Sequence, residues 1–432
     1  MGDINDFLDF VLLREPNIVY VVVGTLLIGA SSGLIGTFAF LKKTSLLGDA
    51  ISHSALPGVC LAFMYMQEKN AIFLLLGSFV SGWIATLLVE WISRRTKLKN
   101  DTAIALILSF FFGVGIFLLT IIQNGGQAAQ SGLNNFLVGK AAAIQRFDIY
   151  IFSGVALLII FFVVTFYRPL KIMVFDRDYA LSIGLPVRIL EFLLNSAIVL
   201  AIAVGIQAVG VILMAALLIS PAAAARFWTY KLSRLLVIAA SIGAFSGWFG
   251  AFVSYTAPDM PTGPWIVTSL SVFAIGSAFF APGSGMISRI KLQQSNSRKM
   301  LSENILKSLF QILEGRDANS HDWIKKSTLF EHRFFDRIKF QKGIRTLDKK
   351  HFIIIDGDKI RLTKQGWAES KRIVRLHRLW ELYLYEKMNL AADHIHPNAE
   401  TMEHILTPEL EKILIKELDY PEKDPHQSKI PE

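Results

Sequence analysis

Two ionisable side chains stand one helical turn apart in an otherwise apolar stretch near the N-terminus. Asp49 and His53 are four residues apart, so a helix would place them on the same face. A carboxylate and an imidazole together suit manganese, iron or zinc better than calcium or magnesium. An ionised aspartate in a membrane span costs about 2.5–3.5 kcal/mol on insertion scales, so such residues usually mark a substrate path. In the alternative interpretation, Asp49 caps the helix at the interface and His53 bonds to neighbouring backbone.

A second set of ligand-type side chains lies near the C-terminus. His377 and Glu381 are four residues apart, and Glu400, Glu403 and His404 stand at i, i+3 and i+4, so each set would share one helix face. Residues 379–432 hold 5 basic and 12 acidic side chains, and this acidic block could hold cations. Packing explains such a ligand-rich helix poorly, although a solvated helix with incidental histidines is the alternative.

The elements that position the first pair are membrane helices. Hydrophobic residues make up 53% of the 432-residue chain and charged residues only 18%, which is too apolar for an ordinary soluble protein of this size. A spanning helix needs roughly 20 mostly apolar residues. Nine segments fit this requirement: Ile18–Leu41, Leu46–Met66, Ala71–Ile92, Thr102–Ile122, Ile149–Tyr167, Ile189–Ile206, Val209–Trp228, Leu235–Tyr255 and Trp265–Phe280.

The distribution of basic residues predicts the orientation of these spans. One set of gaps between them holds 14 Lys and Arg, whereas the alternate gaps and the N-terminus hold 4. Because cytoplasmic gaps carry the excess of positive charge, we expect the N-terminus outside and the C-terminal part in the cytosol. An odd number of spans fits this arrangement. The break from Gly205 to Gly210 is short, so the sixth and seventh spans could instead form a re-entrant pair.

Charge and cysteine content limit the remaining possibilities. The net charge is +5 in residues 1–290 and +11 in residues 291–378, and the basic block could meet nucleic acid or anionic lipid. Cys60 is the single cysteine, so no intrachain disulfide can form. The N-terminus, MGDINDFLDF, lacks a basic segment, so we do not expect a cleaved signal peptide.

The segment Phe175–Val187 (FDRDYALSIGLPV) is the most informative cytosolic gap, because it reads as a short amphipathic helix that either docks on another protein or is a solvated connector. Together with GDAISHSALPGVCLAF and VGVILMAALLISPAAAAR, it resembles the permeases of ATP-binding-cassette importers for manganese, zinc and iron, over about residues 15–285. The resemblance implies that Asp49 and His53 bind the metal in transit. It also implies a coupling helix that docks on a separate ATPase, with these contact residues: Asp178, Ala180, Gly184 and Leu185.

Further partners follow from the same resemblance. They are an extracytoplasmic metal-binding protein and a second permease copy or paralogue, all in or at the bacterial inner membrane. The sequence contains no G-x-x-x-x-G-K-[ST] phosphate loop. We therefore expect a transport subunit and not an enzyme.

The soluble part reads as a winged-helix domain. Helical patches cover Ser302–Leu313, His321–Lys326 and Thr328–Phe340. Residues 351–362 then read as a hairpin, because Asp356-Gly357-Asp358 suits a tight turn.

From Leu362 onward the chain resembles metal-dependent repressors of the diphtheria-toxin-repressor and manganese-transport-regulator family. The resemblance implies a first metal site at His377, Glu381 and His396, and a second at Glu400, Glu403 and His404. Asn304 and Lys307 stand where the family has further second-site ligands, and a charged lysine cannot ligate a metal, so that site is incomplete or altered. Glu331 and Asp336 in the third helix argue against sequence-specific reading of DNA, whereas basic residues between Lys342 and Arg378 could still contact phosphates.

These observations predict an all-α polytopic membrane bundle in residues 1–290, a polar linker in 291–300, a winged-helix-like domain in 301–374 and a metal-binding, dimerisation-like domain in 375–432. The predicted function is the permease of a divalent transition-metal importer, with the metal as substrate and as regulatory ligand of a cytosolic sensing domain. The alternative is a permease fused to a metal-dependent DNA-binding repressor, released by proteolysis in the linker.

Overall fold

The computed structural model describes residues 9–67, 70–124, 139, 144–257, 260–315, 322–388, 408–419, 421–426 and 428–431. The chain divides into two compact units, Met1–Ser288 and Arg289–Glu432. Each unit has its own buried hydrophobic cluster. The chain is therefore built from two separately packed parts.

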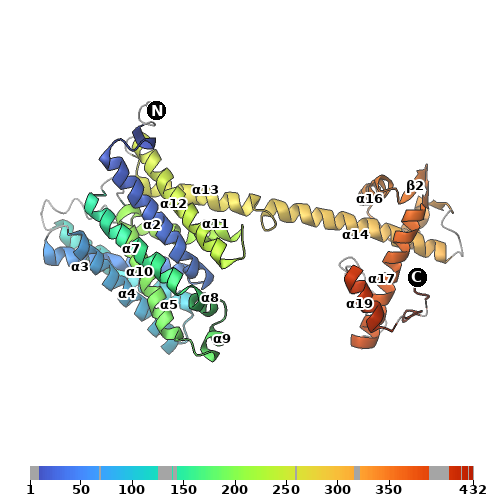
Figure 1. Cartoon of the computed structure of the whole chain (residues 1–432), viewed down its shortest axis with the longest axis horizontal. Coiled ribbons are helices and arrows are strands. Elements are labelled where there is room, and N and C mark those ends of the chain that lie inside the picture. Colours follow the sequence, from blue (N-terminus) through green and yellow to red (C-terminus); the bar gives the residue numbers. More distant parts are fainter. Residues whose placement is uncertain are drawn as a thin grey trace. The chain divides into compact units, whose positions relative to one another are not determined.

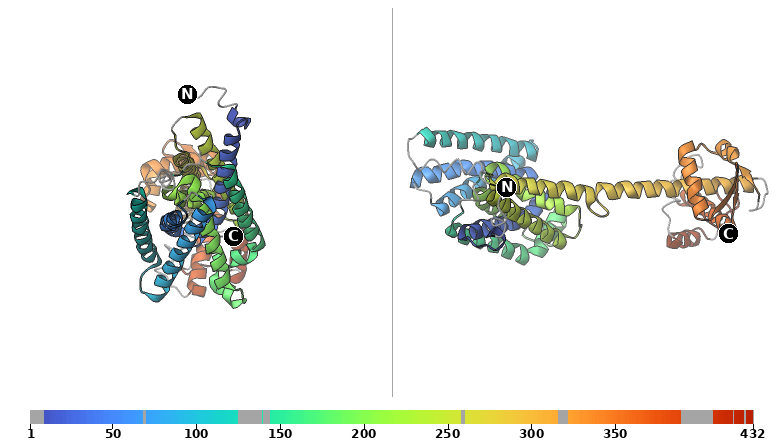
Figure 2. Two further views of the ribbon diagram at one scale, coloured as in Figure 1. Left: turned by 90° about the vertical axis from the view of Figure 1, so that its left-hand side faces the viewer. Right: turned by 90° about the horizontal axis from the view of Figure 1, so that it is seen from above.

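The first unit is a bundle of apolar helices (Figures 1 and 2). Eight helices among the described residues are long and apolar enough to cross a membrane. These helices are α2 (Pro16–Leu41), α3 (Ser45–Met66), α4 (Ala71–Arg95), α5 (Asn100–Asn124), α7 (Arg146–Thr165), α10 (Val187–Val209), α12 (Leu232–Thr256) and α13 (Thr262–Phe280). The multi-pass architecture predicted from hydropathy is thus confirmed.

The seventh predicted span is shorter than expected. It forms α11 (Val211–Arg226), whose 16 residues extend about 24 Å, less than the roughly 30 Å hydrocarbon core. Gly210, with φ of +89°, separates it from α10. Glycine tolerates this backbone region because it has no Cβ. Each of the nine predicted segments therefore forms an apolar helix, and the seventh is shorter than the other eight.

Small residues allow the central helices of the bundle to pack closely. A Cβ added at Gly29 of α2 would lie 2.2 Å from the carbonyl oxygen of Gly243 in α12, which is far inside van der Waals contact. Without water in the bilayer, such close backbone approach supplies the dispersion energy that holds helices together. We infer that close backbone packing, and not charge, holds this helix pair together.

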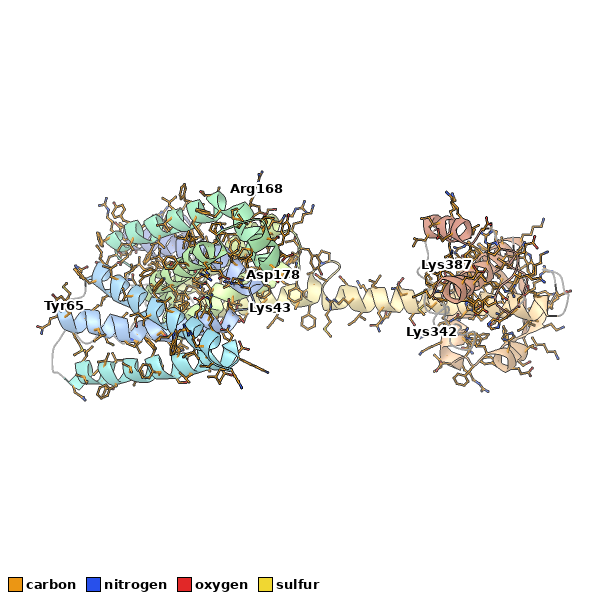
Figure 3. All side chains as sticks on the ribbon, turned by 90° about the horizontal axis from the view of Figure 1, so that it is seen from below. Lys43, Tyr65, Arg168, Asp178, Lys342 and Lys387 are labelled. Atoms are coloured by element: carbon orange, nitrogen blue, oxygen red, sulfur yellow. The ribbon has the colours of Figure 1, made fainter. Side chains whose placement is uncertain are left out.

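Short helices connect the spans at one end of the bundle. They are α8 (Tyr167–Phe175) and α9 (Arg177–Ser182), which together fall in the gap predicted to be cytosolic. Lys43, Arg168 and Asp178 lie at this end, and Tyr65 lies at the other (Figure 3). Two basic side chains of the predicted cytosolic gaps, Lys43 and Arg168, thus lie at the same end of the bundle.

The second unit begins on a long helix and contains a small sheet. Its elements are α14 (Met286–Glu314), β1 (Ile324–Lys325), α15 (Lys326–His332), α16 (Arg337–Lys349), β2 (Ile353–Asp356), β3 (Lys359–Leu362), α17 (Lys364–Met388) and α19 (Pro408–Glu417). The strands are antiparallel in the order β1-β3-β2. The hairpin pairs Asp356 with Lys359, and Gly357 has a φ of +57°, so the predicted Asp-Gly turn is confirmed.

Three local predictions for this unit are wrong. Residues 291–300, predicted as a polar linker open to proteolysis, lie inside α14, because no glycine or proline interrupts residues 286–314. The predicted helix around residues 321–326 contains strand β1 instead, since Ile324 pairs with Ile360. The predicted helix of residues 328–340 is divided into α15 and α16. The Asp336 side chain accepts hydrogen bonds from the backbone N–H groups of Ile338 and Lys339 and so starts a new helix.

Candidate metal centres

Asp49 and His53 face each other on the N-terminal half of α3. Nε2 of His53 lies 3.5 Å from Oδ1 of Asp49. The His53 side chain is 16% exposed and that of Asp49 is 40% exposed, and the edge of Phe112 in α5 packs on the imidazole at 4.9 Å. Nδ1 of His53 is buried and has no hydrogen-bond partner among the described residues. The pair therefore presents an imidazole and a half-open carboxylate to any cation that reaches it.

The rest of α3 holds the pair in place by packing on its other side. Gly48 lies against Leu218 of α11, and Ile51 lies against Gly82 of α4. Helix α3 begins after Thr44, so Asp49 is inside the helix and is not its N-cap. The capping interpretation of Asp49 is thus wrong.

His377 and Glu381 form the corresponding pair on α17. Nε2 of His377 lies 3.1 Å from Oε1 of Glu381, and the side chains are only 4% and 3% exposed. A buried imidazole and carboxylate one turn apart fit a divalent transition metal, because both are its preferred ligand types. The other predicted ligands lie outside the described residues: His396, Glu400, Glu403 and His404. In the described part of the chain, no three His, Cys, Asp or Glu side chains form a metal-binding group.

Charged contacts hold α17 next to His377, and the sequence did not reveal them. The Arg378 guanidinium donates to both carboxylate oxygens of Glu314 in α14, at 3.0 and 2.6 Å, and lies 3.5 Å from Asp424 in the C-terminal tail. Arg375 pairs with the buried Glu411 of α19. The His377–Glu381 pair is therefore supported by contacts with three separate segments.

The two positions that depart from the family pattern lie on α14. Asn304 accepts a hydrogen bond of 3.4 Å from Arg333. Lys307 is 2% exposed, so its ammonium lies inside the folded unit. Neither side chain supplies a carboxylate there, and the altered second site stays a prediction because its other residues lie outside the described ranges.

The predicted docking residues around α9 differ in exposure. Asp178 and Gly184 are exposed, and Gly184 has a φ of +80°. Ala180 is fully buried at 0% and Leu185 is half-buried. Ala180 therefore anchors α9 to the bundle and cannot itself contact a partner in this conformation.

Three apolar side chains that sequence reasoning missed are exposed beside them. Tyr179, Leu181 and Ile183 are 54%, 49% and 47% exposed. In residues 177–184 only Ala180 is buried, and we call Asp178 and these three exposed side chains the outer face of the α9 segment. Apolar side chains at the end of a bundle that carries many lysines and arginines suit a protein contact, because aromatic and aliphatic residues form the anchors of interfaces.

Comparison with known proteins identifies the first unit. The profile of the family described as "ABC 3 transport family" matches residues 14–281. The chain belongs to this family. A member, the manganese transport system membrane protein MntC of Bacillus subtilis (strain 168), is 37% identical over 380 residues, which are 88% of this chain and 86% of the relative. The zinc transport system membrane protein TroC of Treponema pallidum (strain Nichols) is 43% identical over 276 residues, which cover 64% of this chain and 93% of TroC.

Solved structures and a second family profile agree with this assignment. The structure described as "PsaBC from Streptococcus pneumoniae in complex with Fab" is similar with a TM-score of 0.59 and 30% identity, over 66% of this chain and 99% of that chain. The profile described as "Iron dependent repressor, metal binding and dimerisation domain" matches residues 363–432. The ABC 3 permease thus carries a repressor-type metal-binding domain at its C-terminal end, as both resemblances predicted.

Proposed function

We propose that this ABC 3 permease imports a divalent transition metal, manganese or zinc before iron, with Asp49 and His53 as ligands in the transport path. The observation that supports this most directly is the 3.5 Å pair inside a membrane helix, with Asp49 still 40% exposed. The names of MntC and TroC, which state manganese and zinc transport, support the choice of metals.

The exposure of Asp49 also favours a second permease copy. A carboxylate that faces acyl chains is costly, so its open side should meet water or another protein. Two donors are too few for a transition metal, which takes four or more ligands. A second copy that brings its own Asp49 and His53 to the same place would supply a four-ligand set.

The outer face of α9 is the proposed contact for a separate ATPase subunit. Tyr179, Leu181 and Ile183 supply the apolar contact, and buried Ala180 fixes the segment to the bundle. This assignment places α9, and with it the C-terminal unit, in the cytosol and the chain in the bacterial inner membrane. The grouping of Lys43 and Arg168 at the same end as Asp178 supports that orientation (Figure 3).

The C-terminal unit is proposed to sense the imported metal. His377 and Glu381 are already within 3.1 Å and almost fully buried, so metal binding needs little rearrangement of these two side chains. His396, Glu400, Glu403 and His404 would supply further ligands. Metal bound there would couple the cytosolic metal level to transport.

A second candidate function, DNA binding, is favoured by the surface of α16. One face of this helix is exposed and mainly basic. It carries Arg337, Lys342, Arg345 and Lys349, together with Gln341 and the acidic Asp348. The two acidic residues that argued against DNA reading are not on this face, because Glu331 belongs to α15 and Asp336 is the N-cap of α16. Helical residues 291–298 argue against proteolytic release, since a protease needs locally unfolded backbone. A DNA-binding C-terminal unit would therefore act while it is still joined to the membrane helices.

Reconstitution tests the transport function. The chain is placed in proteoliposomes with its ATPase and binding protein, and ATP-dependent uptake of manganese, zinc and iron is measured by elemental analysis. We expect uptake of at least one of these metals that stops without ATP. Uptake of none of them, by a correctly assembled complex that hydrolyses ATP, would refute the proposal.

A further inference from the structure

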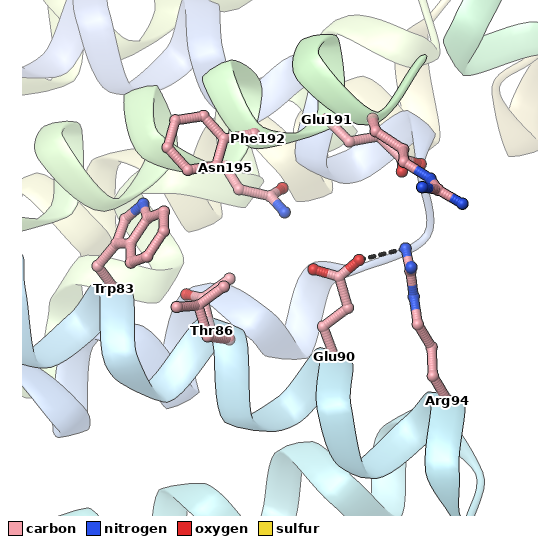
Figure 4. Close-up of a pocket in the computed structure, with 9 residues that line it drawn as sticks. Trp83, Thr86, Glu90, Arg94, Glu191, Phe192 and Asn195 are labelled. Carbon is pink, nitrogen blue, oxygen red and sulfur yellow. Dashed lines mark hydrogen bonds and ion pairs between the residues drawn. The ribbon is translucent and has the colours of Figure 1, made fainter. Parts of the chain in front are cut away.

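A group of five charged residues joins α9 to the membrane helices at the cytosolic end of the bundle. Its members come from separate elements: Lys42 follows α2, Glu90 and Arg94 belong to α4, Arg177 to α9 and Glu191 to α10. Arg177 Nε donates to Oε1 of Glu191 at 3.2 Å, and Lys42 Nζ lies 4.0 Å from the same oxygen. On α4, which faces α10, Arg94 donates a hydrogen bond to Glu90 one turn earlier (Figure 4). We call these residues the Glu191 network.

The centre of the Glu191 network is shielded from water. The side chains of Glu191 and Lys42 are 17% and 21% exposed, whereas Arg177 is 51% exposed at the rim. Charges in such partly desolvated positions attract each other more strongly than surface charges do. Burial lowers the pKa of Lys42, and Glu191 and Glu90 oppose this shift. Displacement of one member therefore changes the energy of the others.

Open space lies beside the network. Cavities of about 220 and 240 Å³ are lined by residues of α4 and α10, including Thr86, Glu90, Glu191 and Asn195 (Figure 4). The larger one also reaches Leu47 of α3. The side chains of the network can move into this space without displacing packed core.

The network also reaches the helix that carries the transmembrane pair. Lys42 is three residues before the start of α3 and seven before Asp49. Leu47 lines the cavity, whereas Asp49, two residues later, points to the other side of α3, because successive helical residues are 100° apart. The network thus lies on the side of α3 opposite to Asp49 and does not occupy the proposed metal ligands.

We propose that Glu191 is a positioning residue that transmits movement of α9 to α10 and, through Lys42, to α3. When a docked ATPase displaces α9, the ion pair between Arg177 and Glu191 moves or breaks. The contact between Glu191 and Lys42 then changes as well. Since Lys42 leads directly into α3, the position of Asp49 and His53 follows the state of α9. This inference rests on the proposed transport function.

The test measures two quantities in the same reconstituted complex: ATP hydrolysis and metal uptake. Glu191→Gln keeps the shape and removes the charge. We expect it to reduce the metal taken up per ATP hydrolysed by about 10-fold, as for a typical coupling free energy between sites. The complex should still assemble and hydrolyse ATP. A merely structural role would reduce assembly and thermal stability and leave this ratio unchanged.

A matched control and a double variant identify the pathway. Arg188→Gln removes an exposed charge one turn from Glu191 that has no ion pair among the described residues, and it should leave the ratio unchanged. Arg177→Gln should lower the ratio. The double variant Arg177→Gln/Glu191→Gln should be no worse than Glu191→Gln alone, because both act through one contact. If the double variant lowered the metal taken up per ATP by the product of the two single effects, or if Glu191→Gln left this ratio unchanged, the inference would be overturned. Uptake by the wild-type complex would still support the transport function.

Discussion

Among the described residues, the same chemical pair occurs at two places, in α3 and in α17, and the two pairs differ mainly in their surroundings. Asp49–His53 and His377–Glu381 each join a carboxylate to an imidazole across one helical turn, at 3.5 and 3.1 Å. The Asp49 carboxylate is 40% exposed, whereas the Glu381 carboxylate of the C-terminal unit is 3% exposed. A cation that must leave needs an open site, and a cation that is held needs an enclosed one. We therefore interpret the first pair as a transit site and the second as a holding site.

The two pairs are also held in different ways. Around Asp49, glycine and apolar side chains pack on the back of α3. Around His377, ion pairs from Arg375 and Arg378 fix the helix. Apolar packing depends little on pH or salt, whereas ion pairs depend on both. The contacts that hold the C-terminal pair should therefore depend more on salt than the apolar packing around the transmembrane pair.

The largest expected effect on stability comes from Arg378→Ala. This change leaves the buried Asp424 without its arginine, and removal of one partner of a buried pair costs roughly 3–5 kcal/mol. Glu314, the other partner of Arg378, is 38% exposed, so its loss costs less. We therefore expect the free energy of unfolding to fall by about 3 kcal/mol, the lower end of that range. Thermal unfolding of the cytosolic unit in the full chain, followed by hydrogen exchange in α17 and the tail, measures it.

Arg372→Ala is the matched control for this prediction. Arg372 lies on the same helix and pairs with Glu369, but these side chains are 35% and 29% exposed, so we expect a loss of about 0.5 kcal/mol. Equal losses in the two variants would show that Arg378 has no special role in holding the His377–Glu381 pair.

A smaller effect is expected for metal retention. His377→Ala removes one proposed ligand of the holding site. We expect manganese binding to weaken by about 100-fold or more, because loss even of a residue that only orients a ligand costs roughly 10- to 100-fold. Isothermal titration of the full chain in detergent measures this affinity. His53→Ala should leave that tight binding unchanged. If His53→Ala abolished it and His377→Ala did not, the roles assigned to the two pairs would have to be exchanged.

The smallest effect concerns pH and the start of α16. Hydrogen bonds from the backbone N–H groups of Lys339 and Ile338 hold the pKa of Asp336 below its ordinary value of 3.8. The ionised carboxylate therefore stabilises the helix start above pH 3.8, and this stabilisation is lost as the pH falls through the lower folded-state pKa. Hydrogen exchange at the first turn of α16, corrected for intrinsic rates, should show a loss of protection at pH 2.5.

Asp336→Asn separates this effect from general acid unfolding. Asparagine also caps helices but does not titrate in this range. The variant should lose less protection than the wild-type chain between pH 6 and pH 2.5. An identical loss in both proteins would mean that other groups control the acid response of α16.

Local signals in the sequence predicted much of this fold. Long apolar runs predicted the helices of the bundle, and Asp356-Gly357-Asp358 predicted the hairpin turn, because both signals depend on neighbouring residues. The pairing of Ile324 with Ile360 was not predicted, since it joins residues far apart in the chain. The break between α15 and α16 has a local cause, the N-cap at Asp336, which the helical pattern of residues 328–340 concealed. The burial of Ala180, the Arg378 contacts and the Glu191 network also join residues far apart in the chain. One-turn spacing did reveal both carboxylate–imidazole pairs.

Metal uptake by paired variants tests the central claim most directly. Proteoliposomes that contain the ATPase, the binding protein and the wild-type chain are compared with those that contain Asp49→Asn/His53→Ala or His377→Ala/Glu381→Gln, and initial rates of ATP-dependent manganese and zinc uptake are measured. We predict that the transmembrane variant loses uptake by about 100-fold or more, since its ligands are needed during passage, whereas the cytosolic variant retains uptake but no longer responds to internal metal. Unchanged uptake in the Asp49→Asn/His53→Ala variant would contradict the account.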